Sequence, residues 1–80
     1  MRTKRPALIL AFSSTAEAIA TEKYCQEHQL PGRLIPVPRE ITAGCGLAWR
    51  AEVEQEEELT RALAQAGIHW QEARVLELWT

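Results

Sequence analysis

A cysteine between two glycines is the pattern in this chain with the clearest chemical potential. Cys45 lies in Gly44-Cys45-Gly46, within a loop-like stretch between two apolar segments. A thiolate is a nucleophile, and nearby cations and backbone N–H groups lower the pKa of its thiol. Gly44 and Gly46 permit backbone angles that direct successive N–H groups at one anion, and Arg39 supplies a positive charge. The residues predict a reachable, reactive thiol; a turn that merely contains a cysteine is the alternative.

The other thiol and imidazole groups form no familiar catalytic or metal-binding motif. Cys25 falls in a helical segment and is interpreted as a small, partly buried apolar residue, so we expect no disulfide with Cys45. Cys25, His28, Cys45 and His69 could each bind a metal, but only Cys25 and His28 have a usable local spacing. The chain has no Cys-x-x-Cys redox motif. The sequence therefore predicts neither a metal site nor a cofactor.

The composition predicts one globular domain over residues 1–80. The chain is 46% hydrophobic and 25% charged, which is typical of a folded protein and not of a disordered one. A chain this short has no room for separate catalytic and substrate domains, and dimerisation would stabilise its small core. The net charge of −2 and the lack of a basic patch beyond the first five residues argue against a nucleic-acid partner.

The N-terminal segment has some features of a signal peptide. Basic residues precede the apolar run 7–12, but this run is short and ends in Ser13-Ser14-Thr15, a helix-start signal. No stretch reaches the roughly 20 apolar residues of a membrane span. We therefore expect a soluble, cytoplasmic protein with reduced thiols and no membrane partner.

Apolar patterning predicts the elements on either side of the cysteine loop. The run 7–12 predicts a buried strand. Ser14 and Glu17 predict a capping box that begins a helix ending at Leu30-Pro31-Gly32. The buried face of this helix is expected to be the stripe Ala16, Ile19, Ala20 and Tyr24.

Three further strands and a second helix complete the pattern. Residues 33–38 predict an edge strand, because two prolines cannot donate ladder hydrogen bonds. Residues 46–51 predict a strand that presents positions 47, 49 and 51 on one face. Residues 54–66 predict a helix that ends at Gly67, and residues 73–79 a last strand. The second helix is expected to bury Leu59, Ala62, Leu63 and Ala66.

The resulting order, β-α-β-β-α-β, is that of the ferredoxin-like, split βαβ fold. This α+β fold has a four-stranded antiparallel sheet, in spatial order 4-1-3-2, with both helices on one face. The turn after the first strand and the connection after the second emerge at the same end of the sheet. Ser13-Ser14-Thr15, interpreted mainly as helix caps, should therefore lie beside Gly44-Cys45-Gly46. This places a helix N-terminus, which stabilises anions, next to the thiol.

Two segments of the chain are similar to those of a known family. They are Pro38-Arg39-Glu40-Ile41-Thr42-Ala43-Gly44-Cys45-Gly46-Leu47 and the opening Leu-Ile-Leu-Ala-Phe-Ser-Ser-Thr. The chain resembles the bacterial DUF3343 family of selenium/sulfur (Se/S) carrier-like proteins. The resemblance covers nearly the whole chain. It implies that Cys45 carries sulfur or selenium as a persulfide or selenopersulfide, with Arg39, Gly44 and Gly46 as its setting. Glu40 also matches, without an implied role, and Trp49 is bulkier than the aliphatic residue expected there. The implied partners are a cysteine desulfurase-type donor and a selenophosphate synthetase-type or other acceptor.

Three classes of function stay open at this point. The first is a non-enzymatic Se/S carrier. The second is a small ferredoxin-like ligand-binding or protein-interaction module without chalcogen transfer, since fold alone does not determine function. The third is a thiol enzyme, although no histidine or acid is clearly placed as a partner of Cys45. The acidic run 52–58 is interpreted as a solvated helix face, and Trp70 and Trp79 either as core caps or as part of a homodimer patch.

Overall fold

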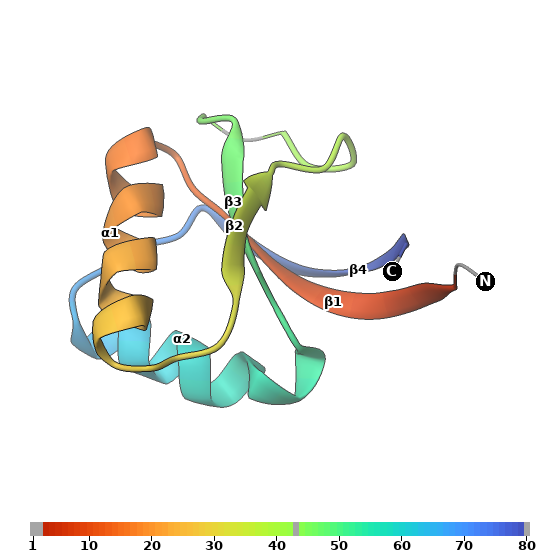
Figure 1. Ribbon diagram of the computed structural model, residues 1–80. Helices are drawn as coiled ribbons and strands as arrows, with labels where there is room; N and C mark the ends of the chain where they lie inside the picture. Colours follow the sequence, from red (N-terminus) through yellow and green to blue (C-terminus); the bar gives the residue numbers. More distant parts are fainter. Residues whose placement is uncertain (1–2, 43, 80) are drawn as a thin grey trace.

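The computed structural model describes residues 3–42 and 44–79. The elements follow one another as β1 (Lys4–Ala11), α1 (Thr15–Glu27), β2 (Arg33–Pro36), β3 (Leu47–Ala51), the short 3₁₀ helix η1 (Val53–Gln55), α2 (Glu56–Gln65) and β4 (Glu72–Trp79). The strands form one antiparallel sheet in the order β2-β3-β1-β4. The predicted ferredoxin-like order is confirmed. Figure 1 shows α1 upright at one side of the sheet and α2 running crosswise below it, and residues of both helices join the same core.

Strand β1 is central because its apolar side chains are buried on both faces of the sheet. Leu8, Leu10 and Phe12 join the core beneath the helices. The alternate residues, Ala7, Ile9 and Ala11, face the other way and form a second cluster with Ile41, from the loop after β2. Val37 and Ile41, both from this loop, therefore pack back onto the face of the sheet that the helices leave open.

The buried face of α1 differs from the predicted stripe. The helix buries Ala18, Thr21 and Cys25, whereas Ile19 is 53% exposed. Burial leaves no hydrogen-bond donor of Thr21 unpaired, because its hydroxyl donates to the backbone oxygen of Glu17 (2.9 Å). The predicted stripe was wrong for Ala16, Ile19 and Ala20, which are exposed, and right for Tyr24, which is half-buried against the core. The buried residues Ala18, Thr21 and Cys25 have small side chains, one of them polar, so hydrophobicity alone did not identify them.

The second helix largely follows its prediction. Leu59 and Leu63 of α2 are fully buried and Ala62 is half-buried, whereas Ala66, predicted to be buried, is exposed at the C-terminus of the helix. Gly67 ends α2 as predicted, with φ 78°, a backbone conformation that favours glycine. Among the described residues, none of the helices has the length and apolar content that a membrane span requires.

The end of α1 was predicted too late in the sequence. The helix ends at Glu27, and Gln29 adopts φ 55°, the left-handed conformation that Gly67 takes after α2. The predicted end at Leu30-Pro31-Gly32 was wrong because glutamine in this position is uncommon. A second feature of that connection is the fit between Gly32 and Trp49. The indole N–H of Trp49 donates to the Pro31 carbonyl (3.1 Å), and Gly32, with φ 121°, lies directly against the ring.

Candidate functional site

The loop 37–46 holds Cys45 against the end of β1. The backbone N–H of Cys45 donates to the Phe12 carbonyl (3.4 Å). Gly44 approaches Ser13 so closely that a Cβ at position 44 would overlap the Ser13 carbonyl oxygen. The predicted proximity of Ser13-Ser14-Thr15 and Gly44-Cys45-Gly46 is thus confirmed. Close backbone packing, and not a positive φ, is what requires glycine at position 44.

The two glycines beside Cys45 differ in what surrounds them. A Cβ added at Gly46 would meet no atom within 4 Å, and the Gly46 carbonyl accepts a hydrogen bond from Val37 N–H (3.0 Å). Neither Gly44 nor Gly46 has a positive φ. Gly44 is therefore a packing requirement of the loop, whereas Gly46 has room for a larger residue.

The Cys45 side chain turns inward. It is 9% exposed and belongs to the core beneath the helices. Its Sγ donates to the Leu47 carbonyl (3.4 Å), a bond that only the protonated thiol can make. The N–H groups of Gly44 and Cys45 donate to oxygens of Gln71 and Phe12, not to sulfur. The expectation of a reachable thiol is therefore wrong, because the Cys45 side chain packs into the core and bonds to the Leu47 carbonyl.

Arg39 and Glu40 form the exposed middle of a turn. Ile41 N–H donates to the Pro38 carbonyl (3.0 Å), which places Arg39 and Glu40 at the two central positions. The backbone carbonyl of Glu40 accepts a hydrogen bond from Arg74 (2.8 Å). No hydrogen bond joins Arg39 to Cys45, both of which lie in the described part of the chain. The Arg39 guanidinium, predicted to stabilise the Cys45 thiolate, is thus near Cys45 in sequence but is not hydrogen-bonded to it.

The N-terminus of α1 lies beside the loop, as predicted, but its capping differs. The Ser14 hydroxyl accepts a hydrogen bond from Glu17 N–H (3.3 Å). The Glu17 carboxylate accepts from His69 N–H (3.3 Å) instead of bonding back to Ser14. The predicted capping box is therefore half formed, and Glu17 ties α1 to the connection between α2 and β4. Ser13 and Thr15 are exposed.

Gln71 fastens the cysteine loop and was missed in the sequence. Its side-chain amide donates to the Thr42 carbonyl (2.7 Å) and accepts from Gly44 N–H (3.3 Å). Its backbone N–H donates to the Ala11 carbonyl (2.7 Å). One glutamine thus ties two loop residues to the end of β1. A polar residue just before a strand carries no periodic signal, so only the tertiary fold could identify it.

Both cysteines are free thiols, and they differ in surroundings. Cys25 is 1% exposed, and burial raises the pKa of its thiol from 9.0 to about 11. It is more deeply buried than the partly buried position predicted for it. Within residues 3–42 and 44–79, no group of three or more His, Cys, Asp or Glu side chains gathers as metal ligands.

The raised pKa of Cys25 predicts a loss of stability in alkali. The pKa of the Cys25 thiol is higher in the folded protein than in the unfolded chain. Its contribution to the free energy of unfolding is therefore fully present below pH 9 and disappears as the pH rises through about 11. A shift of this size corresponds to about 2–3 kcal/mol of unfolding free energy. Urea unfolding at pH 8 and pH 11 should therefore show a smaller alkaline loss for Cys25→Ala than for wild type. Equal losses in both proteins would contradict the assignment.

Comparison with known proteins gives one match. The family model described as "Putative Se/S carrier protein-like" matches residues 7–73, a span that contains the cysteine loop and most of the sheet. No match is found among curated proteins or among solved structures. Since the matched span covers well over half of the chain, the protein belongs to the Se/S carrier protein-like family.

Proposed function

We propose that this protein carries sulfur or selenium on Cys45, as a persulfide or selenopersulfide, and passes it to an acceptor protein. Family membership supports a role in Se/S handling. The observation that carries the assignment to Cys45 is the construction of its loop. Gly44 packs on Ser13 and the Cys45 N–H bonds to Phe12, so the backbone that carries the thiol is held near the residues just before α1.

The proposed transfer needs neither an oxidant nor a cofactor. The Cys45 thiolate attacks the outer sulfur of a persulfide on the donor protein and forms an Sγ–S bond. The S–S bond of the donor breaks, and the donor cysteine leaves as a thiolate that takes up the proton given up by Cys45. A second exchange passes the same sulfur to an acceptor thiol and regenerates the Cys45 thiol. Selenium in place of the outer sulfur follows the same steps.

Loading requires the loop to open, because Cys45 is buried and its Sγ is bonded to the Leu47 carbonyl. The contacts that opening breaks include the two hydrogen bonds of the Gln71 side chain. Gly44 and Gly46 form the immediate setting of Cys45, and the packing of Gly44 on Ser13 is a further contact that opening breaks. The start of α1, with Ser13, Ser14 and Thr15, and the Arg39 guanidinium are the groups that would stabilise the thiolate once it is released.

The partners that fit this chemistry are a cysteine desulfurase-type donor and a selenophosphate synthetase-type or other acceptor, met in the cytoplasm. In this role the domain, taken as residues 1–80, is a carrier and not a stand-alone enzyme. Trp79 is 57% exposed, and a homodimer would bury this side chain at the end of β4. Measurement of the molecular mass in solution tests this prediction.

Intact-protein mass spectrometry after incubation with a cysteine desulfurase and cysteine tests the proposal. Wild type and Cys25→Ala should each gain one sulfur atom that dithiothreitol removes, and Cys45→Ser should gain none. Gln71→Ala should load about five- to 30-fold faster than wild type, because the loop loses two hydrogen bonds worth about 0.5–1 kcal/mol each. Arg61→Gln, on the solvent side of α2, is the control for an unrelated polar change.

A different result would favour the second class of function. If Cys45 in wild type and Gln71→Ala reacts with a small alkylating agent but neither protein gains sulfur, the thiol is accessible without being a carrier. The chain would then be better described as a ligand-binding module, and sulfur carriage on Cys45 would be rejected. Sulfur gained equally by Cys45→Ser would place the cargo on Cys25 and would also reject the proposal.

A further inference from the structure

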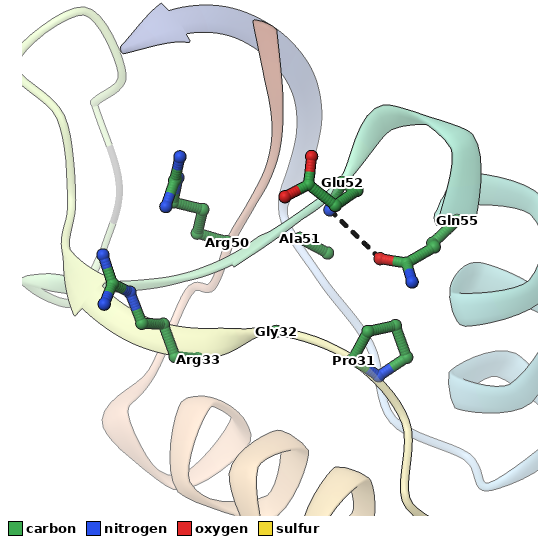
Figure 2. A pocket seen from close by; sticks show the side chains of 7 residues that line it. All are labelled: Pro31, Gly32, Arg33, Arg50, Ala51, Glu52 and Gln55. Carbon is green, nitrogen blue, oxygen red and sulfur yellow. Dashed lines mark hydrogen bonds between the residues drawn. The ribbon is translucent and has the colours of Figure 1, made fainter. Parts of the chain in front are cut away.

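Two arginines lie directly opposite each other on β2 and β3. Arg33 of β2 pairs with Arg50 of β3 in the antiparallel ladder, so their Cβ atoms are about 5 Å apart on the same face of the sheet. Figure 2 shows both side chains rising on the same side of these strands. Like charges placed directly opposite in a sheet are destabilising. A negatively charged group beside Arg33 and Arg50 would therefore stabilise this pair.

No carboxylate supplies that partner in the described part of the chain. The ion pairs there join Arg61 to Glu57 and Arg74 to Glu72, and neither includes Arg33 or Arg50. Moreover, the Nε atom of Arg50 is buried and has no hydrogen-bond partner. Burial of an unpaired guanidinium nitrogen is costly, and such groups in native proteins usually have a partner.

The two arginines open onto a cavity of about 340 Å³, a volume at the small end of the range for small-molecule sites. The cavity lies where β2 begins, where β3 ends and beside η1. It is lined by Pro31, Gly32, Arg33, Arg50, Ala51, Glu52 and Gln55 (Figure 2). Gln55 accepts a hydrogen bond from Glu52 N–H (3.2 Å), which fixes this corner of the cavity.

We propose that Arg33 and Arg50 bind the phosphate group of a small molecule in this cavity. Guanidinium groups form charge-assisted, often bidentate hydrogen bonds to phosphate, and a pair of them matches a dianion. The buried Arg50 Nε–H has almost no accessible surface, so it gains an acceptor only when the Arg50 side chain turns toward the bound phosphate. The Glu52 carboxylate at the rim repels a bare phosphate, and it favours a ligand with a hydroxyl or ammonium group beside the phosphate.

This site is distinct from the cysteine loop. Arg50 lies near the end of β3, whereas Cys45 precedes the first residue of this strand. Arg50 and Ile9 are register partners on the helix-free face, whereas Cys45 belongs to the core beneath the helices. The proposal therefore does not depend on sulfur carriage by Cys45, and either can fail alone.

Titration with inorganic phosphate, followed by NMR at constant ionic strength, tests the site. The Arg50 Nε–Hε signal and the amide signals of Gly32 and Glu52 should shift together and saturate. Arg33→Gln and Arg50→Gln should each weaken binding at least about tenfold, the loss expected from one charge-assisted hydrogen bond. Arg61→Gln, which removes the same charge from α2, should leave the affinity within about twofold of wild type.

Glu52→Gln provides the sharpest arm of this test, because it removes a negative charge and should strengthen the binding of inorganic phosphate by about threefold. The proposal is overturned if the Arg50 Nε–Hε signal does not saturate, or if sodium chloride shifts it equally. It is also overturned if Arg61→Gln weakens binding as much as Arg33→Gln, since phosphate would then respond only to net charge. Because Arg33 is exposed, its variant keeps the test valid even if Arg50→Gln does not fold.

Discussion

Replacement of Gly32 by alanine is expected to lower the free energy of unfolding by about 4 kcal/mol. Gly32 has φ 121°, where an L-residue is strained by about 1–3 kcal/mol. An added Cβ would also overlap the Trp49 indole and approach the Arg50 carbonyl, and overpacking of this kind costs about 1–3 kcal/mol. A domain of this size has a total stability of about 4–12 kcal/mol. Urea unfolding should therefore show Gly32→Ala close to the limit of folding.

Gly67→Ala is the matched control for that experiment. Gly67 also has a positive φ, 78°, but a Cβ there would meet no atom within 4 Å. It should cost about 1 kcal/mol, from backbone strain alone. The difference between the two variants measures the contact of Gly32 with Trp49. If both variants lose the same stability, the close packing of Gly32 on the indole has no energetic importance.

Gly44→Ala is expected to raise the alkylation rate of Cys45 by about 30-fold. The added Cβ would overlap a backbone oxygen of Ser13, which cannot rotate away as a side chain can. The loop must then move off the end of β1. It would lose the hydrogen bonds from Gly44 to Gln71 and from Cys45 to Phe12, together worth about 2 kcal/mol. The rate is measured with a small alkylating agent at neutral pH.

Gly46→Ala and Cys25 are the controls for this prediction. Gly46 has open space around it and no positive φ, so its alanine variant should alkylate within about twofold of wild type. Cys25, at 1% exposure, reports global unfolding. If alkylation of Cys25 in Gly44→Ala becomes faster in parallel with that of Cys45, the whole domain has opened, and local release of the loop is not the cause. No acceleration at either thiol would show that Gly44 does not hold the loop.

The strands could be predicted from the sequence because their signals are local. The run 7–12 is apolar at every position, and the prolines of 33–38 exclude a central place in the sheet. As predicted, Trp49 lies on the same face of β3 as Ala51, whereas Ala48 lies on the other face. These patterns determine the topology, and the topology brings Ser13 to Gly44. The closeness of two segments thirty residues apart was therefore predictable.

The orientation of Cys45 could not be predicted, because it depends on contacts that no local pattern encodes. The loop is held by Gln71, which is distant in sequence and shows no periodicity. The same reason explains the error in α1, where small residues pack against the sheet and Ile19 does not. The pairing of Arg33 with Arg50 depends on the register of β2 and β3, and a shift of one residue would separate the two charges.

The pairing of β1 has a consequence for how the protein behaves at high concentration. From Leu8 to Ala11 this strand has neighbours on both sides, but from Lys4 to Ala7 the described residues pair it with β4 alone. The unpaired side of that segment could recruit a strand from another molecule. Pro6 removes one backbone donor there, since a proline fits a ladder only with its nitrogen turned away from the partner strand. Lys4 and Arg5 add like charges that repel a second copy, so this open side is guarded against aggregation.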